Sequence, residues 1–269
     1  MIRNAVVAGH FYPGSKTSLL REVESLIDSK ARKHDAIGVV SPHAGYAYSG
    51  SVAGSVLSSI EPRSSYIIMG PNHTGLGERF GLDTSDSWAT PLGEVKLNRT
   101  LADAIRNKSS HIKNDSLSHA HEHSVEVQIP FLQVLQEVLT IVPITVSYAS
   151  LDIYREVGKA IAAAIKELSL EKDVTIIASS DMTHYEPHEE AKKKDKVAID
   201  AVLALDEKRL IEKITEMDIT MCGFAPTAIM IVAAKALGAK KASLVRYQTS
   251  GDTSGDYSSV VGYAGILIE

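Results

Sequence analysis

The chain has 269 residues, of which 44% are hydrophobic, and a formal net charge of −5 at pH 7. That length and apolar content allow one large core, and the acidic balance without a basic tract excludes the charge pattern of a nucleic-acid-binding protein. No apolar run reaches the roughly 20 residues of a membrane span, and the single cysteine excludes an intrachain disulfide. We expect a cytoplasmic protein, with no membrane or nucleic-acid partner, that folds as one domain over residues 1–269.

Patterns of apolar residues predict alternating helices and strands along the chain. In the first half we predict a helix over 16–30, a strand over 37–41, a helix over 51–60, a strand over 66–69, a hairpin or long loop over 80–98, helices over 99–107 and 123–138, and a strand over 139–146. In the second half we predict a helix over 153–168, a strand over 174–179, helices over 188–204, 207–214 and 226–237, and strands over 243–248 and 260–268. This alternation predicts an α/β fold with a central, mostly parallel sheet flanked by helices.

Three of the predicted strands are each followed by a polar loop that contains a histidine. His43 lies in "SPHAGYAYSG", His73 lies in "GPNHTG", and Asp181 and His184 lie in "SSDMTHY". Ligands of parallel α/β sheets bind beyond the carboxyl ends of the strands, and parallel strands present those ends at one edge. We therefore expect these four side chains to meet at one edge of the sheet.

Each of these positions allows two interpretations. Neutral imidazoles at His43 and His73 would suit iron, copper or zinc, whereas a single loop histidine more often bonds to backbone groups. Two histidines in matching positions favour a shared metal site. Asp181 either orients His184 as a base or caps a turn that leaves His184 on the surface.

Two further segments carry candidate residues. Cys222 in "DITMCGFAPTAIM" lies close to the predicted start of a helix, which favours the metal-binding thiolate, although a lone cysteine also fits the role of a small buried hydrophobe. The segment "SHAHEHSVEVQIPFL" contains His119, His121 and His123 and is typical either of a metal-binding tract or of a polar loop that leads into a helix. Of these three, we expect only His123 to face a pocket.

Seven segments, in order along the chain, resemble motifs of the MEMO family, which is named after a mediator of ErbB2-driven cell motility. They are "AGHFYPG", "PHAGYAYSG", "GPNHTG", "HEHSVEVQIPFL", "SSDMTHY", "CGFAP" and "TSGDTSGDYSSVVGYAGI". In prokaryotes the family is called AmmeMemoRadiSam system protein B. The resemblance covers essentially the whole chain, and seven collinear motifs are far more specific than any one of them alone.

The resemblance implies a fold like that of class III extradiol ring-cleaving dioxygenases, which are LigB-type non-haem iron enzymes. Those enzymes hold iron with two histidines and a carboxylate, and in MEMO-like proteins the matching positions are two histidines and a cysteine. The metal ligands that the resemblance implies here are His43, His73 and Cys222. It also implies that Asp181 and His184 line that pocket, and His123 matches a further motif position.

The residues and the resemblance together suggest two main functions. One is a metal-dependent redox enzyme for an unidentified small molecule, with iron(II), copper(I) or zinc, with His184 or His123 as general base and Asp181 orienting it. The other is a non-enzymatic module that binds metal or a peptide. The family's eukaryotic member is linked to phosphotyrosine peptides and copper redox chemistry, and its Trp-Tyr pair corresponds here to Phe11-Tyr12.

Two further expectations concern partners and alternatives. The family's association with AMMECR-type and radical-SAM proteins implies partners in a shared modification pathway. A zinc hydrolase is the third alternative function, and the sequence contains no HExxH signature to support it.

Overall fold

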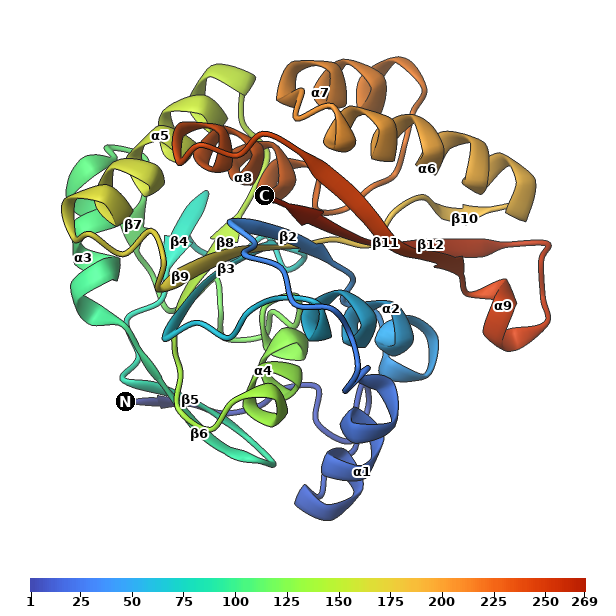
Figure 1. Ribbon diagram of the computed structural model, residues 1–269, viewed down its shortest axis with the longest axis horizontal. Coiled ribbons are helices and arrows are strands. Elements are labelled where there is room, and N and C mark those ends of the chain that lie inside the picture. Colours follow the sequence, from blue (N-terminus) through green and yellow to red (C-terminus); the bar gives the residue numbers. More distant parts are fainter.

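A computed structural model describes residues 1–269, and its centre is one mixed sheet (Figure 1). The strands lie in the order β1 (Ile2–Arg3), β5 (Ser87–Thr90), β6 (Gly93–Leu97), β8 (Thr140–Val146), β3 (Ser65–Pro71), β9 (Val174–Ser179), β2 (Gly38–Ser41), β12 (Val260–Ile268) and β10 (His184–Glu186). In addition, β11 (Ala242–Thr249) pairs with β12, β4 (Phe80–Leu82) pairs with β8, and β7 (Lys113–Asn114) pairs with β4. The central strands β8, β3, β9 and β2 are parallel, so their carboxyl ends lie at one edge.

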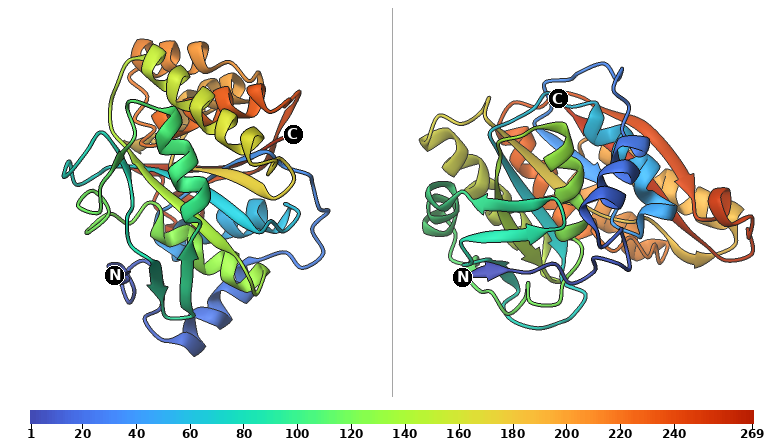
Figure 2. Two further views of the ribbon diagram at one scale, coloured as in Figure 1. Left: turned by 90° about the vertical axis from the view of Figure 1, so that its left-hand side faces the viewer. Right: turned by 90° about the horizontal axis from the view of Figure 1, so that it is seen from below.

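Helices cover both faces of the sheet, as Figure 1 and the two views of Figure 2 show. One face carries α1 (Lys16–Leu26), α2 (Tyr46–Ser58) and α4 (Ile129–Leu135), and α4 continues from the short 3-10 helix η1 (Glu126–Gln128). The other face carries α3 (Arg99–Lys108), α5 (Leu151–Glu167), α6 (His188–Leu203), α7 (Glu207–Glu216) and α8 (Phe224–Ala236). The short α9 (Gly251–Ser254) follows β11. None of the helices is both long enough and apolar enough to cross a membrane.

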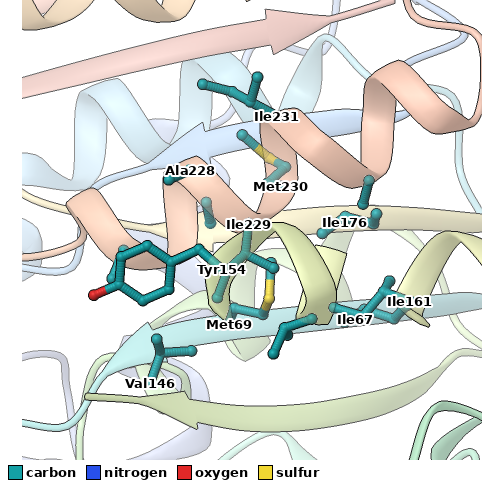
Figure 3. Packing of buried hydrophobic residues seen from close by; sticks show 14 of the residues in the cluster. Ile67, Met69, Val146, Tyr154, Ile161, Ile176, Ala228, Ile229, Met230 and Ile231 are labelled. Atoms are coloured by element: carbon teal, nitrogen blue, oxygen red, sulfur yellow. The ribbon is translucent and has the colours of Figure 1, made fainter. Parts of the chain in front are cut away.

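Two apolar cores form because the side chains of each strand alternate between the faces of the sheet. On β3, Ile67 and Met69 pack toward α5 and α8, whereas Tyr66 and Ile68 pack toward α1, α2 and α4. Figure 3 shows the first of these cores, in which side chains of α5 and α8 lie over β3 and β9. Because both faces are buried, β3 and β9 are continuous apolar runs rather than alternating ones.

The structure confirms the predicted α/β class with a large, mostly parallel sheet flanked by helices, and each predicted helix and strand has a counterpart. Some boundaries differ. Helix α2 begins at Tyr46, five residues before the predicted start, because Tyr46 is buried against the rings of Tyr12 and Phe131. After Tyr46 the next buried positions of this helix are Ser49 and Gly50, which are not apolar, so the sequence shows no helical pattern there.

Two other regions are more broken than the sequence suggested. The helix predicted over 123–138 is the 3-10 turn η1 followed by the short α4, with Pro130 in the first turn of α4. The region 80–98 contains β4 and a hairpin of β5 and β6, in which Thr90 lies opposite Gly93. The elements β1, β7, β10 and α9 were not predicted, because two to four residues are too few to show a period.

Candidate metal centre

Four segments that are distant in the chain meet at the carboxyl edge of the central strands. Strand β2 leads into His43, β3 leads into His73, and β9 leads into Asp181. The fourth segment lies just before α8 and contains Cys222. Its neighbour Gly223 permits the close approach, because a Cβ there would lie 2.3 Å from a backbone oxygen at the end of β9.

His43, His73 and Cys222 form a compact group that could hold a metal ion. Their ligand atoms all lie within 4.8 Å of one another. His43 Nε2 is 3.2 Å from Cys222 Sγ, and the rings of His43 and His73 meet edge to face with their centroids 5.2 Å apart. His43 is buried and Cys222 is partly buried, whereas the His73 side chain is 36% exposed, so the group opens to solvent on the His73 side.

A hydrogen bond on the far nitrogen fixes the His43 ring. The Ser179 hydroxyl donates to the Ser124 carbonyl oxygen at 2.6 Å, so it acts as an acceptor toward His43 Nδ1, which is 2.9 Å away. Nδ1 therefore carries the proton, and the lone pair of Nε2 faces the thiol. Burial lowers the pKa of His43, and the neighbouring histidines lower it further, so the ring stays in the neutral form that binds metals.

The buried carboxylate of Glu122 organises His73 and the segment that follows Glu122. One carboxylate oxygen is 2.9 Å from His73 Nδ1, and the other accepts the His73 backbone N–H at 2.6 Å. The carboxylate also accepts the backbone N–H groups of His123 and Ser124 at 2.9 and 2.8 Å. Burial alone would raise the pKa of Glu122, but the hydrogen bond and charge of His73 help to lower it to about 2. The ionised carboxylate accepts the Nδ1 proton of His73 and leaves Nε2 free for a metal.

The tract "SHAHEHS" divides between this group and other parts of the molecule. The His123 ring stacks on His73 with centroids 4.8 Å apart and contacts Phe11 at 4.7 Å. His119 is buried elsewhere, with Nε2 2.8 Å from a backbone carbonyl oxygen of β4, and His121 is exposed. His73, Glu122 and His123 also have ligand atoms within 4.8 Å of one another.

Glu122 is the main site residue that the sequence analysis missed. Its only signal was its place between two histidines, and a short polar run of that kind is equally typical of an exposed loop. In the structure it is fully buried, and its carboxylate accepts hydrogen bonds from several donors, which suits it to orienting ligands.

Asp181 and His184 lie in one loop but have different partners. Asp181 Oδ1 accepts the His43 backbone N–H at 2.7 Å, and the Asp181 backbone N–H is 3.3 Å from Cys222 Sγ. His184 Nδ1 is 2.9 Å from the Thr220 carbonyl oxygen. Of the two interpretations of Asp181, the hydrogen bonds do not favour the one in which it orients His184: its carboxylate binds the His43 loop, and Thr220 orients His184.

The Cys222 thiol holds its proton more firmly than its place before a helix suggested. Burial raises the pKa of Cys222, and the negative charge of Asp181 raises it further, while hydrogen bonds from the Asp181 backbone and the Ser180 hydroxyl act in the opposite direction. The predicted bias toward thiolate is therefore wrong for the metal-free protein. A metal ion that binds here must displace the thiol proton.

The donor set itself fits a transition metal. Ligands about 2.0–2.3 Å from one tetrahedral ion lie roughly 3.3–3.8 Å apart. The 3.2 Å between His43 Nε2 and Cys222 Sγ is close to that separation. Two imidazole nitrogens and a sulfur favour iron, copper or zinc over magnesium and calcium, which prefer oxygen ligands. With these three side chains as ligands, coordination positions remain for a further molecule.

Comparisons with known proteins cover almost the whole chain. A family model described as "Memo-like protein" matches residues 3–267. A MEMO1 family protein of Methanopyrus kandleri is 43% identical over 281 residues, which span 99% of each chain. A MEMO1 family protein of Methanocaldococcus jannaschii is 40% identical and spans 100% of this chain and 99% of its own. One of Nitrosopumilus maritimus is 41% identical over 99% of each chain.

Proposed function

This chain belongs to the MEMO1 family, and on that premise we propose that it is a metal-dependent redox enzyme for a small molecule that remains to be identified. His43, His73 and Cys222 would hold iron(II) or copper(I), and zinc also suits their donor atoms. The observation that carries the proposal is the convergence of three ligand atoms, from remote segments, within 4.8 Å. The resemblance to extradiol dioxygenases makes catechol-like compounds under O₂ the first substrates to test.

Hydrogen bonds within the protein already orient the side chains that would bind the metal. A redox metal held there would supply electron transfer to a ligand in its open coordination positions. Ser179 and Glu122 hold the Nδ1 atoms of His43 and His73, so neither ring has to rotate when a metal binds. Asp181 supports the same geometry indirectly, because its carboxylate holds the His43 backbone.

We propose His184 as the side chain that moves a proton. Its Nδ1–H donates to the Thr220 carbonyl oxygen, so Nε2 of the neutral ring has a free lone pair. The His184 ring is half-buried and belongs to the same loop as Asp181, whose backbone N–H contacts Cys222. His123 is the alternative base, since its ring lies on His73 while its Nδ1 is 3.4 Å from the Glu122 carboxylate.

Metal analysis and substitution test this proposal. Protein purified without added metal would be reconstituted anaerobically with Fe(II), Cu(I) or Zn(II), and we expect about one bound ion per chain. Cys222→Ser should weaken that binding at least about tenfold, because a hydroxyl is a poor ligand for these metals. His121→Ala, which changes an exposed histidine, is the matched control and should bind like wild type. Equal affinity for Mg²⁺ and Cu(I) would contradict the proposal.

A second substitution separates catalysis from metal binding. His184→Ala should lower turnover of a catechol-type substrate by about 10²-fold or more and leave metal affinity unchanged. His43→Ala should lose both. Absence of turnover in wild type with every metal, together with a silent His184→Ala variant, would favour the non-enzymatic alternative.

That alternative is a module that binds metal or a peptide, and exposed aromatic side chains in the segments that follow His43 and His184 favour it. Tyr48 in the first turn of α2 and Tyr185 next to His184 are 44% and 78% exposed. Aromatic side chains are enriched where proteins bind one another. From the family resemblance, AMMECR-type and radical-SAM proteins are the partners that we propose to test by pull-down with wild type and with a Tyr185→Ala variant. Equal recovery of a partner with both would remove the aromatic surface from this proposal.

A further inference from the structure

One buried aromatic side chain beside the metal group belongs to neither apolar core. Tyr263 on β12 is 2% exposed, yet it packs neither with the core beside α5 and α8 nor with the core beside α1, α2 and α4. A buried tyrosine hydroxyl usually finds a hydrogen-bond partner. The other buried tyrosines all do so, namely Tyr12, Tyr46, Tyr66 and Tyr154.

The Tyr263 hydroxyl has no partner within the protein. The protein does not fully enclose this oxygen, which therefore reaches solvent-accessible space. Tyr263 thus has a large buried ring outside both cores and a hydroxyl without a partner. This combination is typical of a side chain that lines a binding site.

The register of the sheet places Tyr263 past the end of β2. The pairing of β12 with β2 ends where Ile266 lies opposite Val40. The part of β12 before Ile266 extends beyond this pairing, and its Val261 pairs with His184. Tyr263 therefore lies beyond the carboxyl end of β2, where the candidate ligands gather.

Backbone hydrogen bonds tie this part of β12 to the loop that contains Asp181 and His184. The Gly262 carbonyl oxygen accepts the Met182 N–H at 2.8 Å, and the Gly262 N–H donates to the Thr183 carbonyl oxygen at 2.9 Å. Tyr263 is the next residue, so its position is coupled to that of the site loop.

Neighbouring glycines show which way the Tyr263 ring points. A Cβ on Gly262 would meet Met182 and Asp195 on the α6 side, and a Cβ on Gly265 would meet Val52 and Val56 of α2. Side chains alternate along a strand, so Tyr263 shares the face of Gly265 and points to the α2 side.

A neighbour on the adjacent strand brings Tyr263 to the start of α2. Gln248 of β11 lies opposite Tyr263, and its amide donates to the Tyr48 carbonyl oxygen at 2.7 Å. The Tyr263 ring therefore lies between β12 and the first turn of α2, which follows the His43 loop directly.

We propose that the Tyr263 hydroxyl donates a hydrogen bond to the ligand that occupies the His43, His73 and Cys222 group, which makes Tyr263 a ligand-binding residue of this site. This inference rests on the proposed metal site. The ligand chemistry that it selects is a hydrogen-bond acceptor bound beside the metal, such as a carbonyl, carboxylate or phenolate oxygen. Burial and the negative charge of Asp181 raise the pKa of Tyr263, so the phenol keeps the proton that it donates.

Cobalt(II) and azide allow a test without knowledge of the substrate. Cobalt(II) reports thiolate ligation by its absorption, and azide is a small acceptor that can enter an open coordination position. We expect Tyr263→Phe to bind cobalt(II) like wild type but to bind azide about three- to tenfold more weakly, the effect of one lost hydrogen bond. Azide affinity equal to that of wild type would overturn the inference.

Thermal unfolding of the metal-free proteins supplies an independent readout. Tyr66→Phe is the matched control, because the Tyr66 hydroxyl is used inside the fold, where it donates to Gln136 and accepts the Arg63 N–H. We expect Tyr66→Phe to lower the melting temperature and to leave azide affinity unchanged, whereas Tyr263→Phe should leave the melting temperature unchanged or raise it. A melting temperature of Tyr263→Phe as low as that of Tyr66→Phe would assign the hydroxyl to the fold and reject the inference.

The two readouts also separate this inference from the proposed function. Failure of the wild type to bind cobalt(II) would refute the metal site, and the inference that rests on it would fall with it. Normal cobalt(II) binding with no azide difference would refute the role of Tyr263 alone and leave the metal site standing.

Discussion

Two neighbouring buried clusters use their polar groups in different ways. The first cluster consists of Arg3, Tyr12 and Glu126, and we call it the N-terminal cluster because it holds the N-terminal segment. Its Glu126 carboxylate accepts hydrogen bonds from Arg3, from the Tyr12 hydroxyl at 2.6 Å, and from two backbone N–H groups. In the metal group, Glu122 and Ser179 engage one nitrogen of each imidazole and leave the other free. Arg3 joins the clusters, since its guanidinium donates to the Glu122 carbonyl oxygen at 2.5 Å.

The difference shows how a buried polar cluster can serve stability or binding. Once every charge and donor is paired internally, as around Glu126, the cluster has no capacity left for a ligand and holds the N-terminal segment in place. In the metal group, one nitrogen of each imidazole stays free, and these nitrogens converge. They are therefore available to bind an ion. Glu122 and Glu126 are four residues apart, so matched substitutions can test the contrast.

The largest expected effect is on stability, from Glu126→Ala. This change leaves the buried Arg3 charge without its carboxylate partner and should cost about 3–5 kcal/mol of the free energy of unfolding. Urea unfolding monitored by circular dichroism measures it. Metal affinity of the folded variant should stay near that of wild type. A loss below about 1 kcal/mol would place this pair among the weak surface ion pairs and end the contrast.

The next effect is on metal binding, from Glu122→Gln. The amide keeps the volume of the side chain but removes the charge that orients His73, so metal affinity should fall about 10- to 100-fold. A competition titration against a chelator measures this change, with Glu126→Ala as the comparison. Stability should fall less than in that variant, because no buried cation loses its partner. If Glu122→Gln leaves metal affinity unchanged, Glu122 does not orient the ligand.

The smallest effect is the pH dependence of metal affinity. The pKa of Cys222 is raised above its ordinary value, so at neutral pH the thiol is protonated and each bound metal ion releases one proton. Affinity should therefore rise about tenfold per pH unit between pH 7 and 8. The pKa of His73 is also raised, because its bond to Glu122 outweighs the opposing effect of burial, so the slope should steepen in acid. Cys222→Ser should lose the neutral slope, and a wild type without any slope would mean that the thiol is not a ligand.

Much of the fold and part of the site could be predicted from local sequence. The runs that form β2, β3 and β9 are apolar because both faces of the sheet are covered, and a polar loop must follow wherever such a strand emerges. That was enough to place His43 and His73 at one edge of a parallel sheet. The resemblance to a family added Cys222, which no local pattern could have connected with a histidine 179 residues away.

Other features followed from competition between remote partners. Asp181 could have bonded to His184 three residues later, but folding places the His43 backbone N–H within 2.7 Å of its carboxylate. His184 pairs instead with Thr220, which lies in the segment before α8. A sequence shows which groups can form hydrogen bonds, whereas the choice among partners depends on distances that exist only after the sheet has assembled.

The sequence by itself thus determined the class of fold, the strands and the carriers of chemistry, because apolar periodicity and strand-end loops are local properties. The tertiary structure alone decided the protonation of Cys222, the role of Glu122 and the free hydroxyl of Tyr263. Each of these depends on burial and on neighbours from other segments, and the cost of removing a polar group from water is set by the surrounding fold rather than by the adjacent residues.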